Sequence, residues 1–280
     1  SIFIIRRFKP DLVIGTGGFA SGPLLYVATR KGIPSVIQEQ NSFPGVTNRL
    51  LSKYVDKICV AYEKMELFFP HDKIVFTGNP IRKEILDFKN MRKEGEKLFN
   101  IDNDKKTVLV IGGSLGSKTI NESIDKNIDD FKKHNLNLIW QTGISYISKS
   151  QVSINKLNIQ GISSYDFIKE MDKAYAVADI IISRSGAIAI SELCLVGKPL
   201  ILVPSPNVAE DHQTKNAQSL VNKNSALMVK DVDARRNLVS ELITLSKNYS
   251  LQDDLRINIQ KLEVKDAVMK ITDLSLELLK

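Results

Sequence analysis

The chain has 280 residues, of which 43% are hydrophobic and 25% are charged, as is typical of a globular protein with one large domain or two of modest size. It holds no apolar run long enough to span a bilayer, and we expect no signal peptide because its first charges follow the short N-terminal apolar run. The net charge of +7 suits nucleic acid, an anionic membrane surface or a phosphorylated substrate, although a plain solvated lysine-rich surface is its commonest explanation. Without a basic stripe and interleaved aromatic residues, we expect no nucleic-acid partner.

Short apolar strands and helices alternate along most of the chain. Strands are expected at 12–14, 35–37, 57–61 and 74–76, and then at 108–111, 138–140, 180–183, 200–203 and 226–229. Helical stretches lie between most of them. This alternation is typical of a parallel sheet that helices cover on both faces, so the predicted fold class is α/β.

A polar stretch at 83–106 separates the two groups of strands and predicts a domain boundary. We expect a partial N-terminal domain at 1–83, a Rossmann-like domain at 84–232 and C-terminal helices at 233–280. The last of these helices is expected to pack back on the N-terminal domain. Residues 1–83 contain too few strands for a complete doubly wound domain.

The first glycine-rich loop, at 15–23, joins a strand to a helix. Gly15, Gly17 and Ala20 match the loose dinucleotide fingerprint, and Glu39 ends the next strand, where that fingerprint requires an acid. An NAD-dependent oxidoreductase is therefore one hypothesis. Dense glycines also suit any anionic ligand, and a tight turn alone would explain them.

Polar residues follow the next strands. Asn41 can offer a donor and acceptors to a sugar or can cap a helix, and Arg82 can clamp a diphosphate or form an exposed ion pair. The loop at 112–119 nearly matches a P-loop, but Ser117 occupies the second glycine position, so we reject a nucleoside triphosphatase. The loop still suits a pyrophosphate beside Ser114.

Three later segments offer further candidates. The apolar residues of 166–171 can wall a base pocket or form a hydrophobic staple at a helix start. The loop at 183–186 directs N–H groups and a helix N-terminus at one point, where a phosphate or sugar oxygen binds well. Glu192, in that helix, can hold vicinal hydroxyls or lie at the surface, and His212 and Gln213 can bind sugar hydroxyls.

The cysteines and histidines predict no metal site. Cys59 and Cys194 lie far apart, and neither they nor the three histidines show metal-ligand spacing. We expect buried free thiols in a reducing compartment.

In order and spacing, these loops resemble the MurG family, the UDP-N-acetylglucosamine–N-acetylmuramyl-(pentapeptide) pyrophosphoryl-undecaprenol N-acetylglucosamine transferases. The segments that carry the resemblance are 15–23, 39–41, 78–82, 112–116, 184–187 and 211–217. The resemblance implies a GT-B architecture of two Rossmann-like doubly wound parallel-sheet domains, the first incomplete. It implies an inverting glycosyltransferase that moves GlcNAc from UDP-GlcNAc to the C4 hydroxyl of MurNAc in lipid I. The product, lipid II, serves peptidoglycan synthesis and cell-wall biogenesis, and with them cell shape and division.

The resemblance also implies roles for residues in each loop. The donor-binding residues would be Asn41 on the sugar, Arg82 on the diphosphate, Ser114 beside the nucleotide phosphates, Ile168 on uracil through its backbone, Gly186 and Ala187 through N–H groups, Glu192 on the ribose, and Gln213 with His212 on the GlcNAc hydroxyls. The acceptor-binding residues would be Thr16, Gly17, Gly18, Ser21 and Glu39. No tightly bound cofactor and no catalytic metal are implied.

The implied partners are lipid I (undecaprenyl-pyrophosphoryl-MurNAc-pentapeptide), an anionic membrane surface and other cell-wall synthesis proteins. The expected location is the cytoplasmic face of the bacterial inner membrane, because positive charge and apolar N-terminal residues favour peripheral docking. Chains of this family begin with a further strand and a glycine-rich loop that carries a histidine, and nothing before Ser1 supplies them. The general base therefore stays unassigned, and a nucleotide-binding chain without turnover is an alternative.

Overall fold

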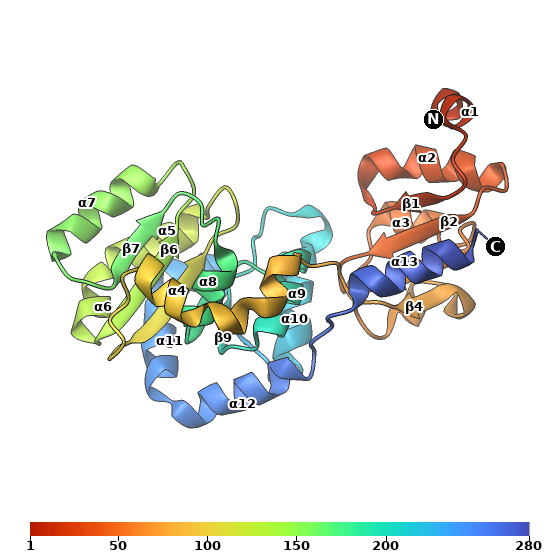
Figure 1. Ribbon diagram of the computed structural model, residues 1–280. Helices are drawn as coiled ribbons and strands as arrows, with labels where there is room; N and C mark the ends of the chain where they lie inside the picture. Colours follow the sequence, from red (N-terminus) through yellow and green to blue (C-terminus); the bar gives the residue numbers. More distant parts are fainter. Residues whose placement is uncertain (280) are drawn as a thin grey trace. The chain divides into compact units, whose positions relative to one another are not determined.

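The computed structural model describes residues 1–279 and consists of two compact units, each built around a parallel sheet (Figure 1). Unit 1 comprises Ser1–Ile81 and the C-terminal segment that begins at Val264, and unit 2 comprises 82–263. The α/β fold class predicted from the alternating pattern is confirmed. The division falls at Ile81, and of the C-terminal helices only the last belongs to unit 1.

Unit 1 has a four-stranded parallel sheet whose strands pair in chain order. The strands are β1 (Val13–Gly15), β2 (Ser35–Glu39), β3 (Lys57–Val60) and β4 (Ile74–Phe76). The helices are α1 (Ile2–Phe8), α2 (Gly18–Arg30), α3 (Val46–Leu51), η1 (Met65–Leu67), η2 (His71–Lys73) and α13 (Ala267–Glu277). β2 is buried along its whole length, as expected for a strand covered on both faces.

Unit 2 has a six-stranded parallel sheet in the order β10-β9-β8-β5-β6-β7. The strands are β5 (Lys106–Ile111), β6 (Leu136–Gln141), β7 (Ile162–Tyr165), β8 (Ile180–Ser183), β9 (Leu200–Leu202) and β10 (Leu227–Met228). The order reverses between β5 and β8, so this is the expected doubly wound sheet. Ligands bind to such sheets at the carboxyl ends of the strands beside the reversal.

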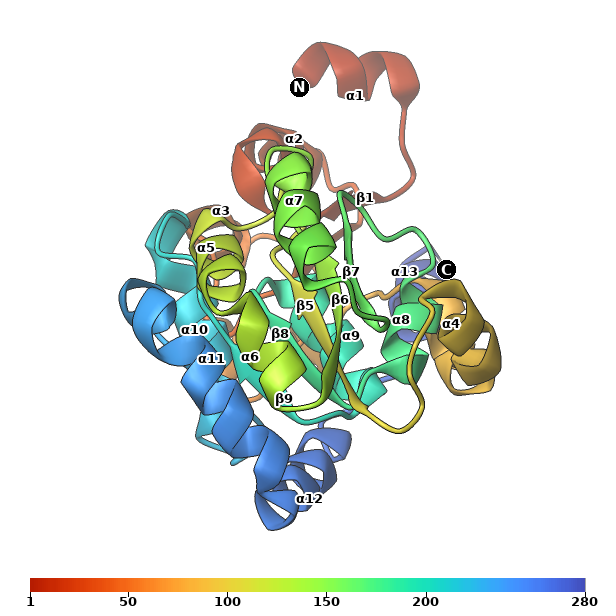
Figure 2. The same cartoon turned by 90° about the vertical axis from the view of Figure 1, so that its left-hand side faces the viewer.

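Helices cover both faces of the unit 2 sheet (Figure 2). They are η3 (Lys83–Met91), α4 (Arg92–Leu98), α5 (Lys118–Lys126), α6 (Ile128–Lys133), α7 (Ile147–Leu157), α8 (Met171–Val177), α9 (Ala187–Val196), η4 (Ala209–Asp211), α10 (His212–Val221), α11 (Asp231–Lys247) and α12 (Tyr249–Gln260). α5 packs against α11, whereas α8 packs against η3 and α4. Within residues 1–279, no helix is both long enough and apolar enough to cross a membrane.

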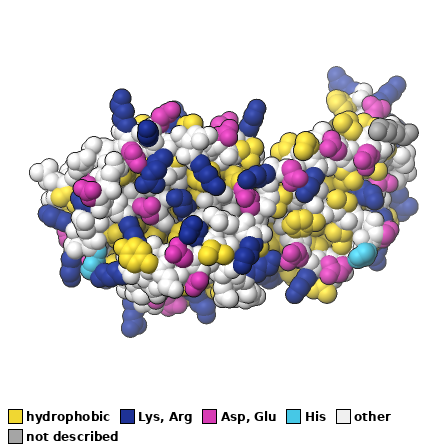
Figure 3. Space-filling view, turned by 60° about the horizontal axis from the view of Figure 1, so that its bottom comes forward, with side chains coloured by type: hydrophobic (Ala, Val, Ile, Leu, Met, Phe, Trp, Pro, Cys, Tyr) yellow, Lys and Arg dark blue, Asp and Glu magenta, His cyan; other side chains and the backbone are white. Residues whose placement is uncertain are grey.

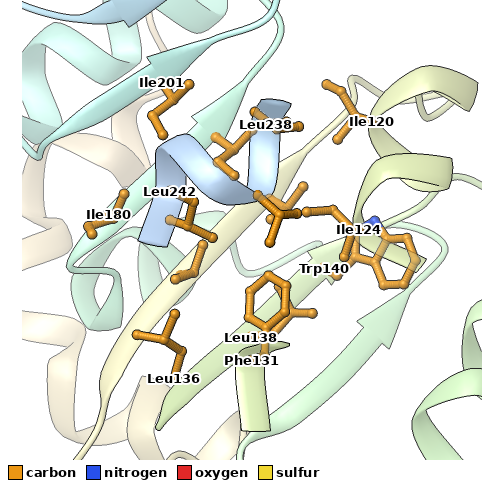
Figure 4. Close-up of a cluster of buried hydrophobic side chains, with 14 of the residues drawn as sticks. Ile120, Ile124, Phe131, Leu136, Leu138, Trp140, Ile180, Ile201, Leu238 and Leu242 are labelled. Carbon is orange, nitrogen blue, oxygen red and sulfur yellow. The ribbon is translucent and has the colours of Figure 1, made fainter. Parts of the chain in front are cut away.

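The main core of unit 2 lies between the sheet and helices α5, α6 and α11 (Figure 4). Val108 and Val110 of β5 belong to this core, whereas the alternate residue Leu109 is buried outside it. Trp140, the single tryptophan, is fully buried here, and its indole N–H donates to Asn121 Oδ1 at 3.0 Å. Leu242 of α11 is also fully buried in this core.

One strand of unit 2 was not predicted. β7 lies at the edge of the sheet, where it pairs only with β6. Its sequence is Ile-Ser-Ser-Tyr, and only Ile162 is buried. An edge strand needs little apolar surface, so the sequence of β7 contains neither an apolar run nor a strong alternation that would predict a strand.

Both cysteines are free and buried, as the sequence predicted. Cys59 lies in β3 and Cys194 lies in α9. Burial raises the pKa of the Cys59 thiol to about 11 and that of the Cys194 thiol to about 12. Both thiols therefore stay protonated and weakly reactive at neutral pH.

Replacing Leu242 with alanine should lower the free energy of unfolding by about 2–5 kcal/mol, because the change leaves a cavity in a closely packed core. The control is Val232→Ala on the same helix, where the exposed side chain should make a difference of less than about 0.5 kcal/mol. Urea unfolding followed by Trp140 fluorescence measures both variants. Equal losses of stability would contradict the placement of Leu242 in the core.

Candidate functional site

A cavity of about 410 Å³ lies within unit 2, at the carboxyl ends of β5, β8 and β9. Its walls come from the loops after these strands and from the first residues of α10 and α11. The lining residues are Ile111, Gly112, Gly113, Gly116, Ser117, Lys118, Thr119, Ser183, Arg184, Gly186, Ala189, Ser205, Pro206, Asn207, Gln213 and Asp231. The cavity thus lies at the reversal of strand order, where ligands of doubly wound sheets bind.

Two helices begin at the wall of this cavity. α5 follows Ser117, whose hydroxyl oxygen accepts a hydrogen bond from the Ile120 N–H at 3.3 Å, and α9 follows Gly186, which provides no side-chain cap. N–H groups at helix starts lack partners within the helix and carry the positive end of its dipole. Lys118 adds a positive charge to the lining. The cavity therefore suits an anion with several oxygens, such as a diphosphate.

The loop after β5 packs closely against the loop after β6. A Cβ on Gly116 would lie 1.9 Å from the carbonyl oxygen of Thr142, and Gly116 has a φ of +79°. A Cβ on Gly143 would lie 2.2 Å from the carbonyl oxygen of Leu115. Glycine is required at both positions because the two backbones approach each other closely there, and this contact fixes one wall of the cavity.

Arg184 ties several segments together at the cavity. Its Nη1 donates to the carbonyl oxygens of Val203 and Pro204 at 2.9 and 3.0 Å, and its Nη2 donates to Ser117 Oγ at 2.6 Å. The guanidinium also forms an ion pair with Asp231 Oδ1 at 2.6 Å. The guanidinium therefore links the loops after β5, β8 and β9 to the start of α11.

Asp231 receives a second contact, because Thr119 Oγ1 donates to its Oδ2 at 2.9 Å. Sequence reasoning included Arg184 in a family segment without giving it a role, and it missed Asp231. The only sequence signal for Asp231 was an acid near a helix start, which is common at exposed N-termini.

Gln213 holds two loops of the cavity in place. Its Oε1 accepts hydrogen bonds from the N–H groups of Ser185 at 3.3 Å and Ser205 at 2.9 Å. Its backbone carbonyl accepts a hydrogen bond from the Ser185 hydroxyl at 2.8 Å. His212, which was predicted to bind the sugar together with Gln213, is not among the lining residues. Its Nε2 lies 4.0 Å from Glu210 Oε2. Within residues 1–279, no three or more His, Cys, Asp or Glu side chains gather as a metal site.

The structure pairs two residues that the resemblance assigned to different parts of the donor. Arg82 Nε donates to Glu192 Oε1 at 2.8 Å, and Arg82 Nη2 donates to Glu192 Oε2 at 2.9 Å. Glu192 is only 4% exposed. Neither residue lines the cavity, although Ala189, three residues before Glu192 on the same face of α9, does. In this arrangement Glu192 is not an open carboxylate, and Arg82 is not a free cation.

Two other predicted donor residues lie outside the cavity lining. The Ile168 side chain is buried, and its N–H donates to Gln141 Oε1 at 2.9 Å, while Gln141 Nε2 donates to the carbonyl oxygen of Gly113. A base contact through the Ile168 N–H therefore requires that Gln141 be displaced. Ser114 is exposed at the tip of the loop after β5. Gly186 lines the cavity, and Ala187 is the first residue of α9.

The structure gives Glu39 a role that differs from the predicted one. Its carboxylate is 2% exposed and accepts hydrogen bonds from the N–H groups of Asn41 at 3.0 Å and Gly45 at 3.2 Å. Asn48 Nδ2 also donates to it at 2.8 Å. Glu39 therefore organises the loop that carries Asn41 and is enclosed by it. The oxidoreductase hypothesis needs this acid free for a ribose, so the structure speaks against that hypothesis.

The remaining acceptor candidates lie on the loop after β1 in unit 1. Thr16 and Gly18 are exposed, and the carbonyl oxygen of Thr16 accepts a hydrogen bond from Gln40 Nε2 at 3.0 Å. Gly17 and Gly18 have φ values of +85° and +75°, so the turn itself requires glycine there. Ser21 Oγ donates to the carbonyl oxygen of Gly18 at 3.4 Å. Contacts of these residues with an acceptor stay a prediction.

Comparison with known protein families gives two matches. Residues 107–271 match the Glycosyltransferase family 28 C-terminal domain, and residues 1–60 match the Glycosyltransferase family 28 N-terminal domain. The first match covers more than half of the chain and contains the cavity.

Curated relatives are similar over nearly the whole chain. A UDP-N-acetylglucosamine--N-acetylmuramyl-(pentapeptide) pyrophosphoryl-undecaprenol N-acetylglucosamine transferase from Parabacteroides distasonis is 49% identical, over 96% of this chain and 73% of the relative. The transferase of the same name from Flavobacterium psychrophilum is 50% identical, over 98% of this chain and 74% of the relative.

Solved structures share the fold. MurG from Acinetobacter baumannii has a TM-score of 0.81 and 28% identity, over 99% of this chain and 76% of that protein. The UDP-GlcNAc 2-epimerase from Neisseria meningitidis, solved with UDP-GlcNAc, has a TM-score of 0.71 at 16% identity, over 98% of this chain and 78% of that protein. The second likeness is one of fold alone.

Gly116→Ala should destabilise unit 2 more than Gly113→Ala does. Both glycines have positive φ, so each alanine strains the backbone by about 1–3 kcal/mol. Only at Gly116 does the new Cβ meet a carbonyl oxygen, whereas the space at Gly113 is open. Urea unfolding followed by Trp140 fluorescence compares the two. Equal losses would contradict the close approach of the two loops.

Proposed function

This chain belongs to glycosyltransferase family 28, and we propose that it transfers GlcNAc from UDP-GlcNAc to the C4 hydroxyl of MurNAc in lipid I. The product is lipid II, so the chain acts in peptidoglycan synthesis. The proposal is supported by 49–50% identity to transferases named for this reaction, over nearly the whole chain. The structural observation that carries it is the cavity at the starts of α5 and α9, which suits the diphosphate of the donor.

The transfer is a displacement at the anomeric carbon of GlcNAc with inversion. The acceptor hydroxyl attacks this carbon and loses its proton to a general base, the bond to the diphosphate oxygen breaks, and UDP leaves with the bonding electrons. Negative charge therefore grows on the diphosphate during the reaction. Helix N-termini that are fixed before the reaction stabilise such charge without reorganisation.

We assign the diphosphate to the cavity wall formed by Gly116, Ser117 and Gly186. The wall gains a positive potential from two helix starts and Lys118. Arg184 contributes little net charge, because Asp231 neutralises it. Asn207, in the loop after β9, and Gln213, in α10, offer amide N–H groups to the hydroxyls of the sugar.

Unit 1 supports a proposal of peripheral attachment to the cytoplasmic face of the bacterial inner membrane. On α1, the side chains of Ile2, Phe3 and Phe8 are exposed by 54%, 72% and 78%, and Arg6 and Arg7 lie beside them. Figure 3 shows exposed hydrophobic side chains among Lys, Arg, Asp and Glu on one face. Apolar and basic side chains together favour an anionic lipid surface, which also carries the lipid-linked acceptor.

Calorimetry with UDP, UDP-GlcNAc and NAD tests the proposed donor. We expect the chain to bind both uridine nucleotides and to leave NAD unbound. Gln213→Ala should weaken UDP-GlcNAc binding by about tenfold, equivalent to about 1.4 kcal/mol, with a smaller effect on UDP. Gln218→Ala on the same helix is the control, because Gln218 pairs with Asn222 at the surface. NAD binding without any response to UDP would overturn the proposal.

Cosedimentation with lipid vesicles tests the attachment of unit 1. Replacing Arg6 and Arg7 with alanine should weaken binding to anionic vesicles by about 30-fold, since each basic residue near such a surface contributes about 1 kcal/mol. Replacing the exposed pair Lys132 and Lys133 in α6 should leave binding unchanged. Binding that is weak and indifferent to anionic lipid would count against the proposed attachment.

A further inference from the structure

Tyr175 is a buried polar residue beside the candidate site that the proposed reaction leaves without a role. It lies on α8 and is only 2% exposed. Its hydroxyl donates to Glu192 Oε2 at 3.2 Å. Burial, and then the charge of Glu192, raise the pKa of Tyr175 well above its usual value, so the hydroxyl keeps its proton and stays a donor.

The carboxylate of Glu192 has two kinds of partner. Arg82 donates to both of its oxygens, but the Arg82 side chain is 46% exposed. Tyr175 donates to one oxygen from the interior. A buried carboxylate needs such partners to offset the loss of water. The partly exposed Arg82 side chain has room to move away from Glu192, whereas the buried Tyr175 side chain is held in place by its packing.

Glu192 lies close to the cavity along α9. Ala189 lines the cavity, and Glu192 follows it by three residues, so both project from the same face about one helical turn apart. Glu192 therefore projects from the face of α9 that contributes Ala189 to the cavity lining. A small shift of the Arg82 side chain would open the Glu192 carboxylate toward a ligand.

We propose that Tyr175 is a positioning residue for the nucleotide, which holds Glu192 Oε2 so that Oε1 can accept hydrogen bonds from the ribose. The proposal rests on the function proposed above, because it assumes a uridine nucleotide in the cavity. For a ribose to take the place of Arg82 on Glu192, the carboxylate must give up two of its three side-chain hydrogen bonds. The Tyr175 hydroxyl is then the remaining side-chain donor that orients it.

The test compares the Kd of UDP with the Kd of 2′,3′-dideoxy-UDP, measured by calorimetry on the full chain. The Kd of 2′,3′-dideoxy-UDP divided by the Kd of UDP reports the ribose hydroxyl contact. Tyr175→Phe removes only the hydroxyl, and we expect the ratio to fall by about tenfold, as for one hydrogen bond to a charged group. Tyr249→Phe is the matched control. Tyr249 lies on α12, and the ammonium of Lys106 lies over its ring at the amino end of β5, whereas the cavity lies at the carboxyl end.

A second variant separates positioning from a general loss of structure. Glu192→Gln should lower the same ratio, and adding Tyr175→Phe to it should lower the ratio no further, because the tyrosine acts through the carboxylate. Discrimination that is intact in Tyr175→Phe would overturn the inference and leave the proposed function standing. A parent chain that binds no UDP would overturn both.

Discussion

The pairing of β5 with β8 is the constraint on which the candidate site depends. Their register runs from Val108 opposite Ile180 to Ile111 opposite Ser183, so both strands end at the same level. Loops that are far apart in the chain therefore emerge side by side, and each leads into a helix. Both strands are buried over almost their whole length, so this pairing lies in the core of unit 2.

The apolar strands of unit 2 were predictable for the same reason. Strands covered on both faces must be apolar on both, and β5 and β8 read as continuous runs of valine, leucine and isoleucine. β7 was not predictable, because at the edge of the sheet Ser163 and Ser164 are only half-buried and no run is required. The glycine-rich loops were also predictable, because close approach of two backbones and positive φ values require glycine, and these glycines are apparent in the sequence.

The partners of the polar side chains were not predictable. Sequence spacing identified Arg82, Glu192 and Glu39 as candidates and left an ion pair open for Arg82, but it named no partner for any of the three. In the structure Glu192 forms an ion pair with Arg82, and Glu39 accepts hydrogen bonds from the loop that follows it. Such pairs join residues from different elements, and their existence follows from the cost of a buried charge rather than from any local pattern. Residue type therefore indicated chemistry, while the fold decided which groups remain available.

Unit 1 is built from both ends of the chain, with all of unit 2 inserted between them. A ribosome therefore completes unit 2 while the segment that begins at Val264 is still unmade. That segment meets the first part of unit 1 at Gly78, where a Cβ would lie 2.6 Å from the Val264 side chain. Domains fold as their residues emerge. The order of synthesis thus completes unit 2 before the segment that begins at Val264 can join the rest of unit 1.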